Sequence, residues 1–197
     1  MVPYSNPPSQ YDWLRQDAVT VAKLLLSYEL VSQIGGAETA GRIVETEAYC
    51  GEVDPASHAF RGPTLRTAPM FEAGGQIYVY LSYGIHTCMN IVAGPAGTAG
   101  AVLIRALEPS RGVDTMQIRR HTTNLWQLCS GPGKLTQALG IGLALSGSRL
   151  GAELSLRAIT PGPIPETIIA GPRVGISRAK DLPWRFTIAD NKFVSKR

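Results

Sequence analysis

The sequence predicts an α+β fold, in which short strands are interspersed with a few short helices. The chain has 197 residues, close to the usual size of one domain. It contains 21 glycines and 14 prolines, an excess that favours many turns and few long helices. Charged residues make up only 17%, which excludes a coiled coil. We therefore expect one domain over residues 1–197, with residues 1–10 as a loose N-terminal arm because three prolines lie there.

The first elements are a helix and a strand. Asp17 is a suitable N-cap for a helix that continues to about Tyr28, because apolar residues recur there at spacings of three and four. From Gly41 the apolar pattern changes to a period of two. This pattern predicts a strand with Ile43, Glu45, Glu47 and Tyr49 on one face and Val44, Thr46 and Ala48 on the other.

Turn residues then dominate residues 50–75, a stretch too long for a plain connection and typical of a functional loop. Residues 76–82 and 86–93 follow as two predicted strands, with Tyr83 at or near the tip of the hairpin between them. Residues 100–107 are expected to form a buried strand because they are almost entirely apolar.

The second half of the chain predicts smaller elements. A short helix is expected over 114–120, and another over 135–139 after the turn that ends at Lys134. Strands are expected at 173–176 and 184–189. The sequence shows no internal repeat and no low-complexity tract.

Charge is distributed unevenly along the chain. Three basic and eight acidic residues give residues 1–58 a net charge of −5, whereas 16 basic and 7 acidic residues give 59–197 a net charge of +9. A basic region rich in arginine suits a polyanion such as nucleic acid. A solvated basic face is the alternative.

Other sequence features narrow the class of protein. The three cysteines are widely spaced and predict no disulfide framework, which favours a reducing, intracellular compartment. We see no secretory signal and no apolar run long enough to span a membrane. The spacing of histidines and cysteines does not fit a metal site, so we expect no metal and no cofactor.

Three charged residues in apolar strands are candidates for chemistry. Glu47 lies in a strand otherwise suited to a core, and Glu45 lies on the same face, so the two could form a glycosidase pair. Solvent exposure of one or both is the alternative. Arg105 interrupts an apolar strand and needs a counter-charge, for which Glu45 or Glu47 is the natural partner. A structural ion pair and a catalytic pair both fit.

Further candidates are polar or aromatic. Asn90 in an apolar strand must find hydrogen-bond partners in the protein or in a ligand. The tyrosines of the same strands could enclose a planar base or form an aromatic core. The turn at Ser130 and Gly131, followed by Lys134, lacks the full phosphate-loop pattern, but its backbone could hold one phosphate or simply cap a helix.

Taken together, ordered segments of the chain resemble the alkyladenine (3-methylpurine) DNA glycosylases. The matching segments are GRIVETEAY at 41–49, DPASH at 54–58, TAPMF at 67–71, YVYLSYG at 78–84, CMN at 88–90, VLIRALEP at 102–109, LCSGPGKL at 128–135 and GPRVGI at 171–176. They span most of residues 17–188 in the order of the family. The segment around Thr87 and the loop 93–100 depart from the family pattern, which leaves the substrate range open.

The resemblance implies a curved antiparallel sheet flanked by short helices, and a monofunctional enzyme of base excision repair that flips damaged purines out of duplex DNA and excises them. We expect the protein to be a monomer. It implies that Glu47 activates water with the help of Arg105. Substrate-binding residues would be Tyr49, His58, Tyr80 and Asn90, of which Asn90 would disfavour guanine. DNA contacts would involve Tyr83, which would fill the gap left by the flipped base, together with Met70, Ser130, Gly131 and Lys134.

Two alternatives to a glycosylase remain open from the sequence. A nucleic-acid binding module would explain the charge and the aromatic residues without any catalysis. A small-molecule glycosidase or nucleoside hydrolase would use Glu45 and Glu47 together and would accept free nucleosides.

Overall fold

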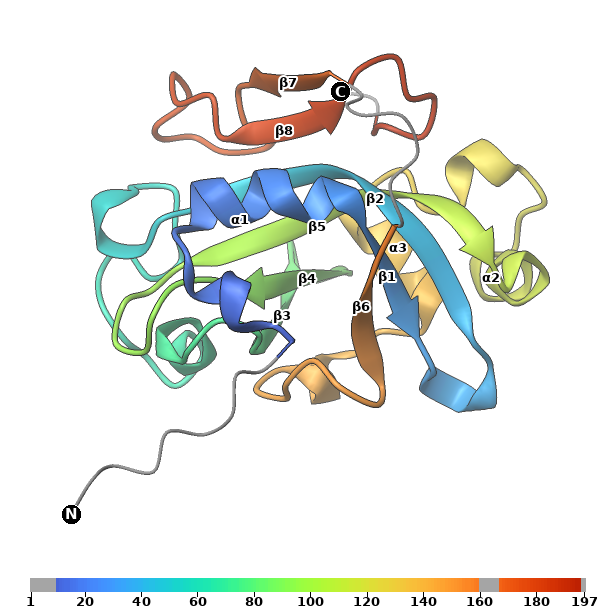
Figure 1. Cartoon of the computed structure of the whole chain (residues 1–197), viewed down its shortest axis with the longest axis horizontal. Coiled ribbons are helices and arrows are strands. Elements are labelled where there is room, and N and C mark those ends of the chain that lie inside the picture. The colour runs from blue at the N-terminus through green and yellow to red at the C-terminus, as the bar shows by residue number, and fades with distance from the viewer. Residues whose placement is uncertain (1–9, 160–166, 196–197) are drawn as a thin grey trace.

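The computed structural model describes residues 10–159 and 167–195, so the predicted N-terminal arm lies almost wholly outside the described residues (Figure 1). Three α-helices are present in the described ranges: α1 (Ala18–Leu24), α2 (Val113–Arg120) and α3 (Pro132–Leu139). The strands are β1 (Tyr28–Ser32), β2 (Thr39–Tyr49), β3 (Ile77–Ser82), β4 (His86–Val92), β5 (Ala101–Arg111), β6 (Leu154–Ala158), β7 (Ile168–Gly171) and β8 (Arg185–Ile188). Short 3-10 helices cover Asp12–Arg15, Leu25–Ser27, Ile34–Gly36, Gly51–Val53, Ala68–Phe71, Leu125–Gln127 and Leu143–Leu145.

The strands form one antiparallel sheet, which confirms the predicted α+β class. Their order is β3-β4-β5-β2-β1-β6, and the β7–β8 pair joins at β2. One edge of β2 pairs with β5. The other edge pairs with β1 near its start and with β8 over Glu45–Glu47. The segment that carries both glutamates is therefore paired on both sides.

Helix α1 begins where the sequence predicts it, because the Asp17 side chain accepts a hydrogen bond from the Thr20 N–H across 2.9 Å. Its predicted end at Tyr28 is wrong. The α-helix ends at Leu24, one 3-10 turn follows, and Tyr28 already belongs to β1. Tyr28 pairs with Ala158 of β6, so strand pairing overrides the helical spacing at this point.

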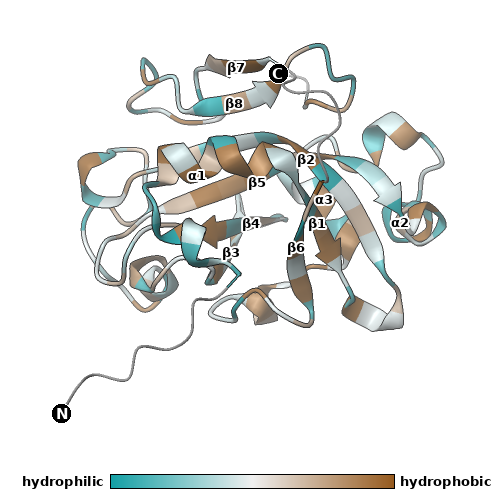
Figure 2. Ribbon diagram, viewed as in Figure 1, coloured by the Kyte–Doolittle hydropathy of each residue, from teal (hydrophilic) through white to brown (hydrophobic). Residues whose placement is uncertain are grey.

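The core lies on both faces of the sheet. Helix α1 packs on β2 and β5, and α3 packs on β4 and β5 and against α2. In Figure 2 apolar residues dominate β4 and β5 and part of α1. The Thr46 hydroxyl donates to the Ala22 carbonyl of α1 across 2.8 Å, which fixes which face of β2 meets the helix. The opposite face, with Glu45, Glu47 and Tyr49, is directed away from α1, as the period of two predicts.

The predicted hairpin is present between β3 and β4. Its tip includes Tyr83, which adopts a positive φ of 50° and is 83% exposed. An exposed aromatic side chain in a left-handed backbone conformation is unusual, because only glycine and a few short polar residues adopt it at little cost. The turn therefore projects a large ring away from the sheet.

The predicted strand at 173–176 is wrong, because these residues form a loop. The backbone N–H of Val174 donates to the carboxylate of Glu47 and is therefore not available for strand pairing, while the side chain of Arg173 turns inward to Asp54. The neighbouring strand is instead β7, which pairs with β8. The predicted strand at 184–189 is confirmed as β8. No helix in the described part of the chain is long and apolar enough to cross a membrane.

Candidate active site

A cavity of about 930 Å³ opens beside the central strands. Its walls come from the loop between β2 and β3, from β3, β4 and β5, from the start of α3, and from the loop after β7. The four predicted substrate-binding residues and Arg105 all line this cavity, although each comes from a different element. They are Tyr49, His58, Tyr80, Asn90 and Arg105. Regions separated by more than a hundred residues in sequence thus converge on one concave site.

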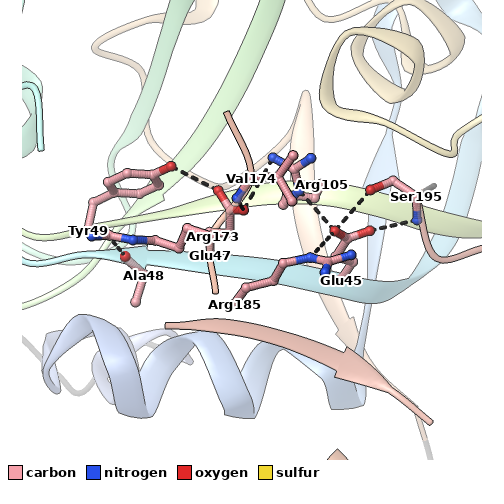
Figure 3. Close-up of polar contacts among 9 residues, drawn as sticks. All are labelled: Glu45, Glu47, Ala48, Tyr49, Arg105, Arg173, Val174, Arg185 and Ser195. Atoms are coloured by element: carbon pink, nitrogen blue, oxygen red, sulfur yellow. Dashed lines mark hydrogen bonds and ion pairs between the residues drawn. The ribbon is translucent and has the colours of Figure 1, made fainter. Parts of the chain in front are cut away.

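Glu47 lies immediately behind this wall and is fully buried. Its Oε2 accepts the phenolic hydrogen of Tyr49 across 2.8 Å, and its Oε1 accepts the Val174 N–H across 2.7 Å (Figure 3). The Arg105 Nη1 lies 3.4 Å from Oε1. All three partners also line the cavity, so the carboxylate is held at its edge. Solvent exposure of Glu47, one of the alternatives from the sequence, is excluded.

Arg105 reaches both glutamates because of an irregularity in strand pairing. Thr46 pairs with Ile104 and Glu45 pairs with Ala106, which leaves Arg105 without a partner residue on β2. Val44 is skipped in the same way on the opposite strand, so the two irregularities compensate. A bulge of this kind re-aims the side chain of its extra residue. Here it directs a guanidinium to the edge of the cavity.

Glu45 is also fully buried, but its environment differs from that of Glu47. Its Oε1 accepts from the Nε atoms of Arg105 (2.9 Å) and Arg185 (2.7 Å) and from the Ser195 hydroxyl (3.0 Å). Its Oε2 accepts from the Ser195 N–H across 2.7 Å. Neither glutamate is among the residues that line the cavity, but three partners of Glu47 line it, whereas Arg105 is the one partner of Glu45 that does. Four protein donors therefore take up the acceptor positions of the Glu45 carboxylate, which argues against a glycosidase pair.

These surroundings shift the pKa values of Glu45 and Glu47 in opposite directions. Burial raises the pKa of Glu47, and the opposing effects of Arg105, the Val174 N–H and Tyr49 do not cancel that rise. Burial also acts on Glu45, but there Arg105 and the Ser195 donors outweigh it and lower its pKa below the ordinary value. Adjacent carboxyl groups with diverging pKa values are typical of a site in which the two have different tasks.

The aromatic side chains of the cavity wall contact one another. The rings of Tyr78 and Tyr80 stack with centroids 5.6 Å apart, and His58 meets Tyr80 edge-on at 4.6 Å. The Nδ1 of His58 lies 3.0 Å from the Tyr78 hydroxyl oxygen. Burial and nearby Arg66 lower the pKa of His58, which favours the neutral imidazole. A planar aromatic ligand would fit between such walls.

Asn90 lines the same cavity from β4. Its side-chain amide donates to the Tyr78 carbonyl across 3.1 Å. Asn90 is 3% exposed, so the orientation of its side chain is fixed by packing and by this bond. The residue is therefore both a satisfied donor and a rigid feature of the cavity wall.

The predicted DNA-contacting residues fall into two groups. Tyr83, Gly131 and Lys134 line the cavity. Met70 lines it as well but is only 2% exposed and packs among Tyr78 and other apolar residues, so any contact with DNA would be indirect. Ser130 does not line it and instead forms an isolated bridge with Ala106 of β5. Basic side chains at the cavity include Arg66, Arg120 and Arg178.

Sequence reasoning missed two contributors to the site, namely the Val174 N–H and the buried Asp54–Arg173 pair, although both lie inside the matched segments. The Arg173 Nη2 lies 2.8 Å from Asp54 Oδ1, and the guanidinium carbon lies 4.6 Å from the centre of the Tyr49 ring. A loop arginine thus holds the neighbours of Glu47 in place. Within the described ranges, no three histidine, cysteine, aspartate or glutamate side chains group as metal ligands.

A recessed carboxylate at the edge of an aromatic cavity suits an enzyme that hydrolyses a bond of a planar ligand. Comparison with known proteins identifies the family. The sequence model of the methylpurine-DNA glycosylase (MPG) family matches residues 12–192. A relative from Methanoculleus marisnigri is 51% identical over 185 residues, which cover 92% of this chain and 95% of the relative. A relative from Chlorobaculum tepidum is 47% identical over 186 residues, which cover 94% of this chain and 89% of the relative.

Both relatives are provisionally named 3-methyladenine DNA glycosylases. The chain therefore belongs to the methylpurine-DNA glycosylase family. It is a DNA glycosylase, a hydrolase of base excision repair, and its substrate is DNA. This membership removes the alternative of a binding module without catalysis.

Proposed function

We propose that this protein acts as a monomer on duplex DNA and excises alkylated or deaminated purines, namely 3-methyladenine, 7-methylguanine, hypoxanthine and ethenoadenine. The damaged base is flipped into the cavity, and water activated by Glu47 breaks the bond between base and sugar. The reaction leaves an abasic site. The observation that carries this proposal is the position of Glu47 at the edge of the aromatic cavity, in contact with three residues that line it.

The contacts of Glu47 leave room for one more donor. A carboxylate offers about four acceptor positions. Tyr49, Val174 and Arg105 take three of them, which leaves one on Oε2 for a water molecule. Glu47 removes a proton from that water as the oxygen attacks the sugar, and Arg105 keeps the carboxylate oriented. General base catalysis of this kind contributes about 10²–10⁴ in rate.

The leaving group determines how much further assistance the enzyme must provide. Alkylation at N3 or N7 makes the purine cationic, so it departs without strong acid catalysis. Flipping costs a few kcal/mol, and stacking against aromatic walls returns roughly 1–3 kcal/mol. Tyr80 and His58 provide those walls, and Tyr83 fills the vacated place in the duplex. Asn90 disfavours guanine because its fixed side chain crowds the 2-amino group.

We further propose that the enzyme lacks a lyase step. A lyase needs an amine that attacks the sugar and forms a Schiff base. Lys134 lines the cavity, but it lies in the first turn of α3, where it suits contact with a phosphate. Borohydride should therefore fail to trap a covalent complex between the protein and DNA that contains a lesion.

The deciding experiment is a single-turnover assay with enzyme in excess over duplexes that each carry one lesion. Glu47→Gln keeps the size of the side chain and should retain lesion binding while losing excision by about 10² or more. Glu29→Gln is the matched control, because Glu29 also pairs with arginines but lies on β1 away from the cavity. Near-normal excision by Glu47→Gln would disprove the mechanism, and release of base from free nucleosides would point to the nucleoside hydrolase instead.

A further inference from the structure

The second glutamate of β2 has a set of contacts that the proposed mechanism does not use. Glu45 is fully buried and lies outside the cavity lining, yet it accepts four hydrogen bonds. One of its partners, Arg105, is the residue that also contacts Glu47. Figure 3 shows Arg105 between the two carboxylates, with Ser195 on the far side of Glu45 and Arg185 reaching it from below in this view.

We propose that Glu45 and Ser195 form a positioning pair that sets the orientation of the Arg105 guanidinium against Glu47. The proposal rests on the proposed role of Glu47 as the base. It gives a function to Ser195, which lies near the end of the described chain and does not line the cavity.

The geometry of arginine explains why such an anchor is effective. The guanidinium is planar, and its N–H groups point in fixed directions. Glu45 accepts a hydrogen bond from the Arg105 Nε across 2.9 Å, and this bond restricts rotation of the Arg105 side chain. With Nε held, Nη1 is directed to Glu47 Oε1 at 3.4 Å. Arg105 sits at a bulge, so the strand pairing alone does not fix its direction.

Glu45 is in turn held from the C-terminal side. Ser195 contributes both its N–H (2.7 Å) and its hydroxyl (3.0 Å). The segment that carries it is docked by Phe193, which is 8% exposed and meets the Trp126 ring at 4.7 Å. Asn191 adds a hydrogen bond of 3.0 Å to Glu108 of β5. The end of the described chain is thus tied to the strand that carries Arg105.

Charge gives this arrangement a measurable signature. The titratable or charged groups that face Glu47 are Glu45 and Tyr49 on β2, Arg105 on β5, Arg173 in the loop after β7, Arg185 on β8, and Tyr80 and Cys88 on β3 and β4. Among them Glu45 is the one carboxylate, and it shares Arg105 with Glu47. Loss of the Glu45 charge alone would lower the pKa of Glu47, but a misplaced Arg105 removes a larger effect that holds this pKa down, so misplacement of Arg105 makes Glu47 ionise at higher pH.

The test measures single-turnover excision and lesion binding over a range of pH. Glu45→Gln keeps the size of the side chain and removes the charge, and Glu29→Gln is its control. Ser195→Ala removes one donor, Ser195→Thr restores it, and Ser32→Ala is the control for loss of a buried hydroxyl elsewhere in the sheet. Glu47→Gln is run in the same series.

We expect Glu45→Gln to lower the excision rate by about 10–100-fold with little change in lesion affinity, because misplacement of a catalytic group acts on the chemical step. The acidic limb of its pH profile should move to higher pH, because Glu47 loses the stabilising charge of a correctly placed Arg105. Ser195→Ala should reduce the rate by a smaller factor, and Ser195→Thr should recover it. Both controls should match wild type.

Two results would overturn this proposal and leave the proposed function intact. One is a wild-type rate and pH profile in Glu45→Gln and Ser195→Ala while Glu47→Gln is inactive. The other is a loss of rate that is accompanied by equal loss of binding and thermal stability with an unmoved pH profile, since that is a purely structural role. If Glu45→Gln does not fold, Ser195→Ala and its threonine rescue decide. Excision by Glu47→Gln would overturn the proposed mechanism and this inference together.

Discussion

The hydroxyl of Tyr49 donates to the carboxylate of Glu47, two residues earlier in the same strand, across 2.8 Å. Burial and the nearby charge of Glu47 raise the pKa of this phenol, so it stays protonated and remains a donor. Tyr49 thus contacts the proposed base as well as forming part of the cavity wall.

Replacement of this tyrosine by phenylalanine tests that second role. The donation lowers the pKa of Glu47, so Tyr49→Phe should move the acidic limb of the excision profile to higher pH and reduce the rate at neutral pH by about tenfold. Tyr28→Phe, which alters a ring stacked on Trp13 and distant from the cavity lining, is the control. An unmoved profile in Tyr49→Phe would show that the hydroxyl does not tune the base.

The pH dependence of the wild-type enzyme follows from the surroundings of Glu47. Burial raises its pKa, and only the ionised form can accept a proton from water. Excision of 7-methylguanine should therefore fall as the pH drops, with a midpoint above about 4.3, the value of a free glutamate. The cationic lesion is the substrate of choice because its departure needs no protonation. A rate that is constant down to the ordinary glutamate range would contradict the prediction.

The buried pair of Asp54 and Arg173 should be important for stability. Both side chains are fully buried, and Asp54 also accepts from the backbone N–H of Ala56. Asp54→Asn leaves a buried guanidinium without its anion, which typically costs about 3–5 kcal/mol. Urea denaturation measures this loss. The control Glu29→Gln disrupts ion pairs with partially exposed arginines and should cost less than about 1 kcal/mol, so equal losses in the two variants would contradict the argument.

Tyr83 should matter for flipping but not for folding. It is 83% exposed at the tip of the β3–β4 hairpin, so Tyr83→Ala should leave the free energy of unfolding within about 0.5 kcal/mol of wild type. Its excision defect should be large for a paired lesion and smaller for an unpaired one, because flipping an unpaired base costs less. Ile85→Ala, at an exposed position of the same turn, is the control. Equal defects on both substrates would argue against a role in flipping.

Lys134 offers a test of phosphate contact. It lies in the first turn of α3 and lines the cavity. Lys134→Gln should weaken binding of damaged and undamaged duplexes alike and should reduce the slope of log K against log salt by about 0.9. Fluorescence anisotropy at several salt concentrations measures both. An unchanged slope would remove Lys134 from the interface with DNA.

The sequence predicted most of the sheet, because the period of two survives in β2, β3 and β4 and glycines mark their ends. It failed at Tyr28, where helical spacing continues into a residue that pairs with β6. It also failed at Arg173–Ile176, where the side chain of Arg173 and the N–H of Val174 are committed to tertiary contacts. Local patterns carry no information on partners more than a hundred residues away.

For the site, the sequence could identify charges in apolar strands but not their arrangement. It suggested Arg105 as a partner of either glutamate, and the structure shows contact with both. The bulge that permits this depends on the register between β2 and β5, which neither strand encodes alone. The contribution of Ser195 depends on a segment that returns to the sheet after β8. Only the assembled fold defines such contacts.

The pairing of β2 on both edges at Glu47 separates two roles within one site. The proposed base is anchored in a strand that is paired on both edges, where local opening is least favourable, whereas loops supply much of the rim of the cavity. Loops tolerate substitution and insertion far more readily than a doubly paired strand. Changes in lesion preference can therefore accumulate at the rim while the hydrolytic step stays the same, so one chemistry can serve many kinds of damage.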